Sequence, residues 1–194
     1  MKPISAWAQF YAGRNNDEYY QHVTDKYGVF IHEILKAMRS GDRVVEFGCG
    51  LSNITRNLIT MSKDEWMLFV GLDNEVEMLR MSQQNLERAG IPHSKVLFYN
   101  GDARRGVLLG DIAHSHGLLE HFPDTDIRAI INHQKGRFRE LLHYVPSAKY
   151  KIPSFGDERL MTPEQWRKIC QPDEIIEFND GYDLILWWKR VQAI

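Results

Sequence analysis

Glycine and acidic residues follow three short apolar segments of the sequence, and their types suggest a site for a small ligand. The first segment, VVEF, contains Glu46 and runs into Gly48 and Gly50. The second ends at Asp73, and the third is followed by Asp102. Glycine lets the backbone approach a ligand closely, and a carboxylate can accept two hydrogen bonds from a ribose diol. These positions together predict a nucleoside site.

Such a site requires strands and helices that bring its residues to one edge of a sheet. Apolar spacing and turn residues predict an alternation of the two. The expected helices are 17–39, 52–62, 74–90, 126–136 and 162–170, and the expected strands are 43–48, 67–73, 95–100, 111–117, 140–146, 174–179 and 183–190.

This alternation predicts an α/β, Rossmann-like, doubly wound fold with a mostly parallel seven-stranded sheet and helices on both faces. Gly90 is placed to end one helix, and Thr162 followed by Pro163 to begin the last one. Asp180 and Gly181 form a turn signal between the last two strands, which predicts a hairpin and an antiparallel C-terminal strand. In such a sheet, ligands bind beyond the carboxyl ends of the strands.

Composition excludes several classes of protein. The 194 residues suit a single domain, and no apolar run approaches the roughly 20 residues that cross a bilayer. Cys49 and Cys170 are the only cysteines, and the N-terminus lacks the apolar core of a signal peptide. We therefore expect a cytoplasmic protein. With 24 basic and 26 acidic residues, bulk charge gives no sign of nucleic-acid binding.

The pattern Glu46-x-Gly48-x-Gly50, followed by Asp73 and Asp102, resembles the class I S-adenosylmethionine-dependent methyltransferases, and Ser52 stands where a third glycine is common. The resemblance runs from about residue 41 to the C-terminal hairpin and implies S-adenosylmethionine as the cofactor. It places a carboxylate near the methionine ammonium, glycines under the methionine and ribose, and acidic residues at the ribose and the adenine. The cofactor-binding residues it implies are Glu46, Gly48, Cys49, Gly50, Asp73, Asn74, Asp102, Ala103, His116 and Gly117.

The segment SHGLLEHF after the fourth strand is similar to a stretch that many small-molecule members of this family carry beside the reactive methyl group. We expect His116 on the cofactor side and His121 on the acceptor side, with His121 and Glu120 as the catalytic candidates. The alternative for Glu120 and His121 is a structural role at the start of the next helix.

Aromatic residues of the N-terminal segment have no place in the predicted sheet. We expect residues 1–40 to form a helical lid, with Trp7 to Tyr20 over the site, and residues 41–194 to form the cofactor-binding core. The predicted substrate-binding residues are Tyr11, Tyr19 and Tyr20, and Trp166 is a further candidate beside the methyl group. Ordinary packing of the tyrosines remains the alternative.

The expected activity is methyl transfer to a nitrogen, oxygen or carbon of a small molecule. An NAD-dependent oxidoreductase is less consistent with the sequence, because Asn53 stands where the dinucleotide fingerprint needs Gly or Ala. The [Asp/Asn]-Pro-Pro-[Tyr/Phe] segment that accompanies methylation of adenine or amide nitrogens is absent after the fourth strand, and no pair of acidic metal ligands is evident. A module that binds the cofactor without transferring its methyl group stays open, as do the acceptor and the oligomeric state.

Overall fold

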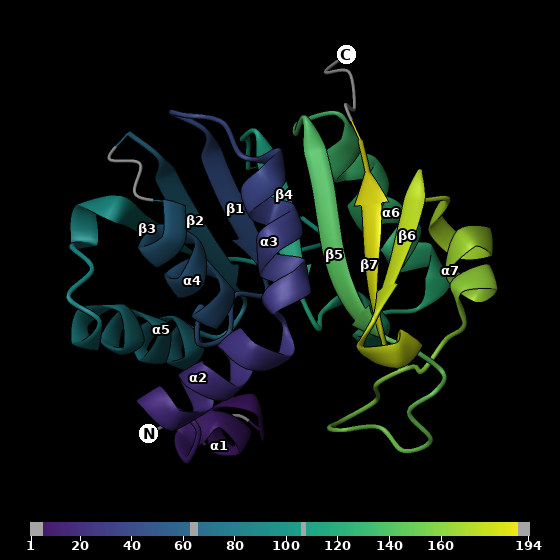
Figure 1. Ribbon diagram of the computed structural model, residues 1–194, viewed down its shortest axis with the longest axis horizontal. Coiled ribbons are helices and arrows are strands. Elements are labelled where there is room, and N and C mark those ends of the chain that lie inside the picture. Colours follow the sequence, from purple (N-terminus) through teal and green to yellow (C-terminus); the bar gives the residue numbers. More distant parts are fainter. Residues whose placement is uncertain (1–5, 63–65, 106–107, 190–194) are drawn as a thin grey trace.

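One mixed sheet forms the centre of the protein. The computed structural model describes residues 6–62, 66–105 and 108–189. Its strands lie in the order β3-β2-β1-β4-β5-β7-β6 (Figure 1). They are β1 (Arg43–Phe47), β2 (Leu68–Asp73), β3 (Val96–Asn100), β4 (Ile112–His116), β5 (Glu140–Pro146), β6 (Glu174–Phe178) and β7 (Asp183–Trp188). Strands β1 to β5 pair in parallel and β7 is antiparallel to both neighbours, which confirms the predicted sheet.

Three helices cover one face of the sheet: α3 (Gly28–Ala37), α4 (Asn53–Ser62) and α5 (Val76–Arg88). Val44 of β1 and Ile112 of β4 belong to the buried apolar cluster beneath them. Because side chains alternate along a strand, every second residue of the buried strands joins this layer.

Two helices cover the opposite face: α6 (Asp124–Lys135) and α7 (Pro163–Cys170). Val45 and Ala113, which directly follow Val44 and Ile112 in the chain, belong to the cluster on this side. Both faces of the central strands are therefore apolar, as expected for parallel strands between two helical layers. The prediction of helices on both faces is confirmed.

The N-terminal part differs from the prediction of one helix over 17–39. It contains α1 (Ala6–Ala12), which was not among the predicted helices, and α2 (Asp17–Lys26), which is separate from α3. Tyr27 breaks the helix with φ −107° and ψ 19°. The side chain of Asn179 donates to the last carbonyl of α2 at 3.0 Å, so a distant segment satisfies a backbone group that a continuous helix would use.

Local signals explain where other helices end. Thr162 and Gln165 form a capping box at the start of α7, and the helix has proline in its first turn. Gly90 has φ +70° just after α5, where a left-handed residue closes a helix. Short 3-10 helices lie at η1 (His93–Lys95), η2 (Leu119–His121) and η3 (Asn179–Gly181), the last within the predicted hairpin.

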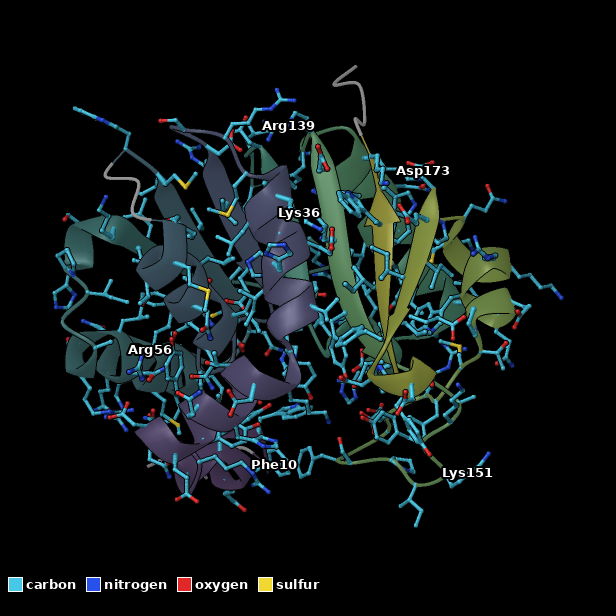
Figure 2. The ribbon with its side chains drawn as sticks, in the orientation of Figure 1. Phe10, Lys36, Arg56, Arg139, Lys151 and Asp173 are labelled. Atoms are coloured by element: carbon cyan, nitrogen blue, oxygen red, sulfur yellow. The ribbon has the colours of Figure 1, made fainter. Side chains whose placement is uncertain are left out.

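The strand order reverses between β1 and β4, because β2 and β3 lie on one side of β1 and β5 lies on the other. In open α/β sheets, ligands bind at this point, outside the carboxyl ends of the strands. Helices α1 and α2 lie at this end of the sheet in Figure 1, and so does the loop that contains Lys151, which Figure 2 labels. The fold therefore places the N-terminal helices beside the predicted site.

Candidate active site

The turn after β1 passes close to the segment after β4. Gly48 has φ +64°, and a Cβ at this position would lie 2.7 Å from Cδ1 of Leu118. A side chain at position 48 would therefore be strained by its backbone conformation and would also collide with Leu118. Ser52 has φ +53° in the same turn and is fully buried, which explains why related turns commonly carry glycine there.

Asp73 ties the glycine turn to the end of β2. Its Oδ2 accepts a hydrogen bond from the N–H of Gly50 at 3.0 Å, and its Oδ1 accepts one from the N–H of Glu75 at 3.0 Å. Burial raises the pKa of Asp73, against the effect of these two donors. Each carboxylate oxygen retains acceptor capacity, and Asp73 borders a cavity, so the residue can accept further bonds from a ligand.

Glu46 is a buried carboxylate without a basic partner among the described residues. It is 2% exposed, and the hydroxyl of Thr55 donates to its Oε2 at 2.6 Å. Burial raises the pKa of Glu46 to about 8. Glu46 lines a small recess together with Gly48 and Gly50, next to the main cavity. A cationic ligand group at this recess would stabilise the ionised carboxylate.

Asp102 lines the same cavity as Asp73, and its carboxylate is paired with Arg104. The guanidinium donates to both carboxylate oxygens, at 2.9 Å to Oδ1 and 2.5 Å to Oδ2, and this lowers the pKa of Asp102. Arg104 also contacts Asp126 of α6 at 3.3 Å. The ion pair holds the loop after β3 against α6, and it leaves the buried backbone of Ala103 at the cavity wall.

Two adjoining cavities open at the carboxyl ends of the strands. The first has a volume of about 170 Å³, and the predicted cofactor residues that line it are Gly48, Gly50, Asp73, Asn74, Asp102, Ala103, His116 and Gly117. The second has a volume of about 230 Å³ and lies between the N-terminal helices, the end of β5 and the loop before α7. The tyrosines that line it come from the N-terminal helices and from β5 and the loop after it. Tyr11 and Tyr19, two of the three tyrosines predicted to bind substrate, are among them.

Five residues border both cavities and so define the junction between them: Trp7, Tyr11, His116, Gly117 and His121. Two come from α1, and three come from the end of β4 and the segment that follows it. A group bound in one cavity can therefore meet a group bound in the other at these residues. The structure brings both predicted histidines to this junction.

Glu120 is the buried carboxylate of the second cavity. It is 1% exposed, and its Oε2 has no hydrogen-bond partner among the described residues. A Cβ built on Gly117, a junction residue, would lie 3.3 Å from Oε1 of Glu120. Burial raises the pKa of Glu120 to about 8. A buried carboxylate oxygen without a donor is costly, and a ligand N–H or O–H would satisfy it.

The two histidines of the junction differ in their surroundings. His116 is enclosed by aromatic rings, with the centroid of Tyr27 at 4.1 Å and that of Tyr144 at 4.7 Å. Burial, and then the charge of Lys26, lower the pKa of His116 to about 3, so its imidazole is neutral. His121 instead has its Nδ1 atom 3.0 Å from Oδ1 of Asp157, a residue of the loop before α7.

Three predicted side chains lie away from the two cavities. The hydroxyl of Tyr20 donates to Asn57 at 3.1 Å, and its ring lies under the guanidinium of Arg56. Tyr20 therefore packs on α4 and does not line the second cavity. Trp166 is fully buried in the core under α7, not beside the junction. The Cys49 thiol is buried, and a Cβ on Gly71 would lie 3.1 Å from its Sγ, so the side chain packs against β2, while the residue borders the small recess that contains Glu46.

Sequence reasoning missed several residues of the second cavity. Lys26 and Tyr27 lie at the break between α2 and α3, where one continuous helix was predicted. Tyr144 and Pro146 lie at the end of β5, and the loop after it adds Tyr150. The rule that ligands bind beyond the carboxyl ends of parallel strands was a signal for Tyr144. The spacing of residues within a predicted helix gave no such signal for Lys26.

Two features are absent from the described residues, 6–62, 66–105 and 108–189. These residues contain no helix long and apolar enough to span a membrane. They also contain no group of three or more His, Cys, Asp or Glu side chains arranged to hold a metal ion.

Comparison with protein-family models and with curated protein sequences finds no match. Solved structures do match. The PH0226 protein from Pyrococcus horikoshii is 12% identical, with a TM-score of 0.74 over 97% of this chain and 100% of that one. Magnesium protoporphyrin IX methyltransferase from Synechocystis, solved with bound S-adenosylmethionine, is 18% identical, with a TM-score of 0.63 over 96% of this chain and 85% of that one. The small RNA methyltransferase HEN1 is 14% identical, with a TM-score of 0.68 over 84% of this chain and 25% of that one.

These similarities establish the fold. The protein has the α/β fold of the class I S-adenosylmethionine-dependent methyltransferases, with the seven-stranded sheet and antiparallel last strand that its sequence predicts. At these identities the comparisons do not extend to an acceptor, so the chemistry rests on the residues of the site.

Proposed function

We propose that the protein is an S-adenosylmethionine-dependent methyltransferase that acts on a small molecule. The observation that carries this proposal is the pair of cavities that meet at Trp7, Tyr11, His116, Gly117 and His121. A transfer between two ligands needs such a shared junction, because the donor and the acceptor must be aligned and kept from water.

The residues of the first cavity and of the small recess beside it fit S-adenosylmethionine. Glu46, buried and without a basic partner among the described residues, would pair with the methionine ammonium. The open backbone at Gly50 would lie along the ligand, and Asp73 would accept hydrogen bonds from the ribose. Asn74 and the backbone of Ala103 would border the adenine. When bound, S-adenosylmethionine supplies a methyl group on a positively charged sulfur, and its transfer leaves S-adenosylhomocysteine.

The same residues suit a dinucleotide poorly. A pyrophosphate is bound by free backbone N–H groups of a glycine turn at a helix N-terminus. Here the N–H of Gly50 already donates to Asp73. Asp73 also makes the surroundings of the turn negative, and burial lets Glu46 ionise readily only beside a cation, so both residues favour a cationic ligand group over a phosphate.

The chain's own contribution to methyl transfer would be alignment, exclusion of water and removal of a proton. Trp7 and Tyr11 of α1 cover the junction, and Gly117 lets the backbone after β4 approach it. If the attacking atom carries a proton, the ionised form of Glu120 can accept it at Oε2, and the raised pKa of Glu120 makes that form a stronger base than an ordinary carboxylate. His121, oriented by Asp157, is the second candidate base.

We further propose a cytoplasmic protein, because both cysteines are free thiols buried in the fold. A small acceptor is supported by the size and lining of the second cavity, which we call the acceptor cavity. Its volume is about 230 Å³, and its aromatic rings are closely spaced. Single-stranded nucleic acid would need a basic groove, and the overall charge of −2 gives no support for one.

Calorimetry and product analysis test this proposal. We expect binding of S-adenosylmethionine and S-adenosylhomocysteine, no binding of NAD, and release of S-adenosylhomocysteine when the protein is incubated with S-adenosylmethionine and pools of small metabolites. Absence of binding would overturn the cofactor assignment. Binding without product in any pool would favour a non-catalytic module that only holds the cofactor.

A further inference from the structure

The second cavity contains a lysine, Lys26, that forms no ion pair with any other described residue. Lys26 is the last residue of α2 and lines this cavity but not the first. Its Nζ atom lies 5.1 Å from the ring centroid of Tyr27 and 5.3 Å from that of Tyr150. Neither ring borders the first cavity. The ammonium of Lys26 therefore lies in the acceptor cavity on the side of these two tyrosines.

The acidic residues around this cavity have other partners or other positions. Glu158 accepts hydrogen bonds from the backbone N–H and the hydroxyl of Ser154. Asp183, fully buried beneath the tyrosines, accepts from Tyr144 at 2.7 Å and from Tyr150 at 3.1 Å.

Glu120 lies against Gly117 at the junction. None of these three carboxylates forms an ion pair with Lys26 within the described residues. An ammonium that lines a cavity and forms no ion pair with the described residues favours an anionic ligand group there.

A second basic residue, His22, lies in the same part of the cavity as Lys26. His22 lies one helical turn before Lys26 on α2 and lines the same cavity. Residues four apart on a helix lie on one face, so both side chains are directed to the same region.

The remaining walls of the cavity are aromatic. The rings of Tyr27 and Tyr144 lie 4.8 Å apart, and the rings of Trp7 and Phe155 lie 4.6 Å apart. Aromatic walls favour a flat ligand, because a planar ring buries its faces against them.

We propose that the acceptor is a flat aromatic acid whose carboxylate pairs with Lys26. This inference rests on the proposed methyltransferase function. With the carboxylate at Lys26, the ring extends between the tyrosines, and the nucleophilic N–H or O–H group is directed to the junction. There Oε2 of Glu120, which has no donor among the described residues, accepts its hydrogen bond. The acid group thus sets the orientation in which the acceptor presents its nucleophile.

Pairs of probes of similar shape, one a carboxylate and the other a neutral amide, test the proposal. We would titrate benzoate against benzamide, 4-hydroxybenzoate against 4-hydroxybenzamide, and indole-3-acetate against indole-3-acetamide, by ligand-observed NMR with saturating S-adenosylhomocysteine. In wild type, at least one acid should bind roughly tenfold or more tightly than its amide. Equal binding within every pair, or no binding of any acid while S-adenosylhomocysteine binds, overturns the proposal.

Three variants locate the effect. Lys26→Met should abolish the preference for the acid over its amide, and Lys26→Arg should retain most of it. Lys36→Met is the matched control, because Lys36 pairs with Glu33 on the surface of α3 and does not line the cavity. Retention of the preference in Lys26→Met, or its loss in Lys36→Met, contradicts the assignment. Binding of S-adenosylhomocysteine, measured on the same samples, tests the proposed function separately, since its failure would remove that function whatever the probes do.

Discussion

The Nδ1 atom of His121 lies 3.0 Å from the Oδ1 atom of Asp157, so a residue after β4 is held by a residue of the loop before α7. Asp157 is largely exposed, with 81% of its side chain accessible, whereas the imidazole is 15% accessible and borders both cavities. The interaction lowers the pKa of Asp157. It fixes the ring of His121 so that the other ring nitrogen is available to the junction.

If His121 is the general base, His121→Ala should lower turnover by roughly 100-fold and leave the affinity for S-adenosylhomocysteine nearly unchanged. Turnover would be followed as S-adenosylhomocysteine released with the metabolite pool that is active with wild type.

Asp157→Asn is the companion variant, because it keeps the shape of the residue and removes its charge. We expect a smaller loss of turnover than in His121→Ala, because the asparagine can still orient the imidazole by a hydrogen bond but no longer stabilises the imidazolium that forms when His121 takes the proton. Unchanged turnover in His121→Ala would assign the pair to loop packing.

The lid prediction centres on Trp7. Its ring lies 5.2 Å from that of His121 and 4.6 Å from that of Phe155, so it connects α1 with both segments that form the acceptor cavity. Trp7→Ala, or deletion of residues 1–16, should impair methyl transfer more than cofactor binding, because the opened junction admits water. Trp66→Ala is the control, since this tryptophan is 82% exposed and distant from the cavities. Equal activity of the Trp7 variant and wild type would show that α1 only packs on the outside.

Much of this architecture was predictable because short-range signals determine it. The alternation of strands and helices, the hairpin at Asp180 and the capping residue Thr162 are all local features, and the structure has them. The positions of Gly48 and Asp73 followed from the rule that residues after parallel strands meet at one edge.

The acceptor cavity was less predictable because it depends on which side of a helix faces inward. Tyr19 and Tyr20 are neighbours in α2, but Tyr19 lines the cavity and Tyr20 packs on Arg56. Trp166 has the amphipathic spacing of a core residue and lies in the core. Lys26 acquires its place only because the chain bends at Tyr27, which no residue pattern had indicated.

Asp73→Ala tests the cofactor site. The substitution removes an acceptor for the ribose and also frees the N–H groups of Gly50 and Glu75. Hydrogen bonds to a charged acceptor contribute roughly 1.5 to 3 kcal/mol each. Affinity for S-adenosylmethionine should therefore fall at least about tenfold by calorimetry. Asp25→Ala, an exposed change on α2, should leave it unaltered. Unaltered binding in Asp73→Ala would exclude the ribose contact.

The pH dependence of stability tests the environments of Glu46 and Glu120. Burial raises the pKa of each to about 8 in the folded protein, from 4.5 in the reference state. The folded state therefore binds more protons than the unfolded state between these values, and stability falls as pH rises through this window. The buried His114, His116 and His143 act in the opposite sense below about pH 6.5, because burial lowers the pKa of each to about 3.

The two effects separate above pH 6.5, because the contribution of these three histidines fades within about one pH unit as they lose their protons in the unfolded state, while the glutamates continue to contribute. Between pH 6.5 and 8, each glutamate should lower the free energy of unfolding by up to about 2 kcal/mol, at no more than 1.36 kcal/mol per pH unit. Urea unfolding of the ligand-free protein should show this decline in wild type, a shallower one in Glu120→Gln and in Glu46→Gln, and a wild-type slope in the exposed control Glu18→Gln. If the slope of Glu120→Gln equals that of wild type, the pKa of Glu120 is not raised in the folded protein, and a donor or a positive charge already stabilises its carboxylate before any acceptor binds.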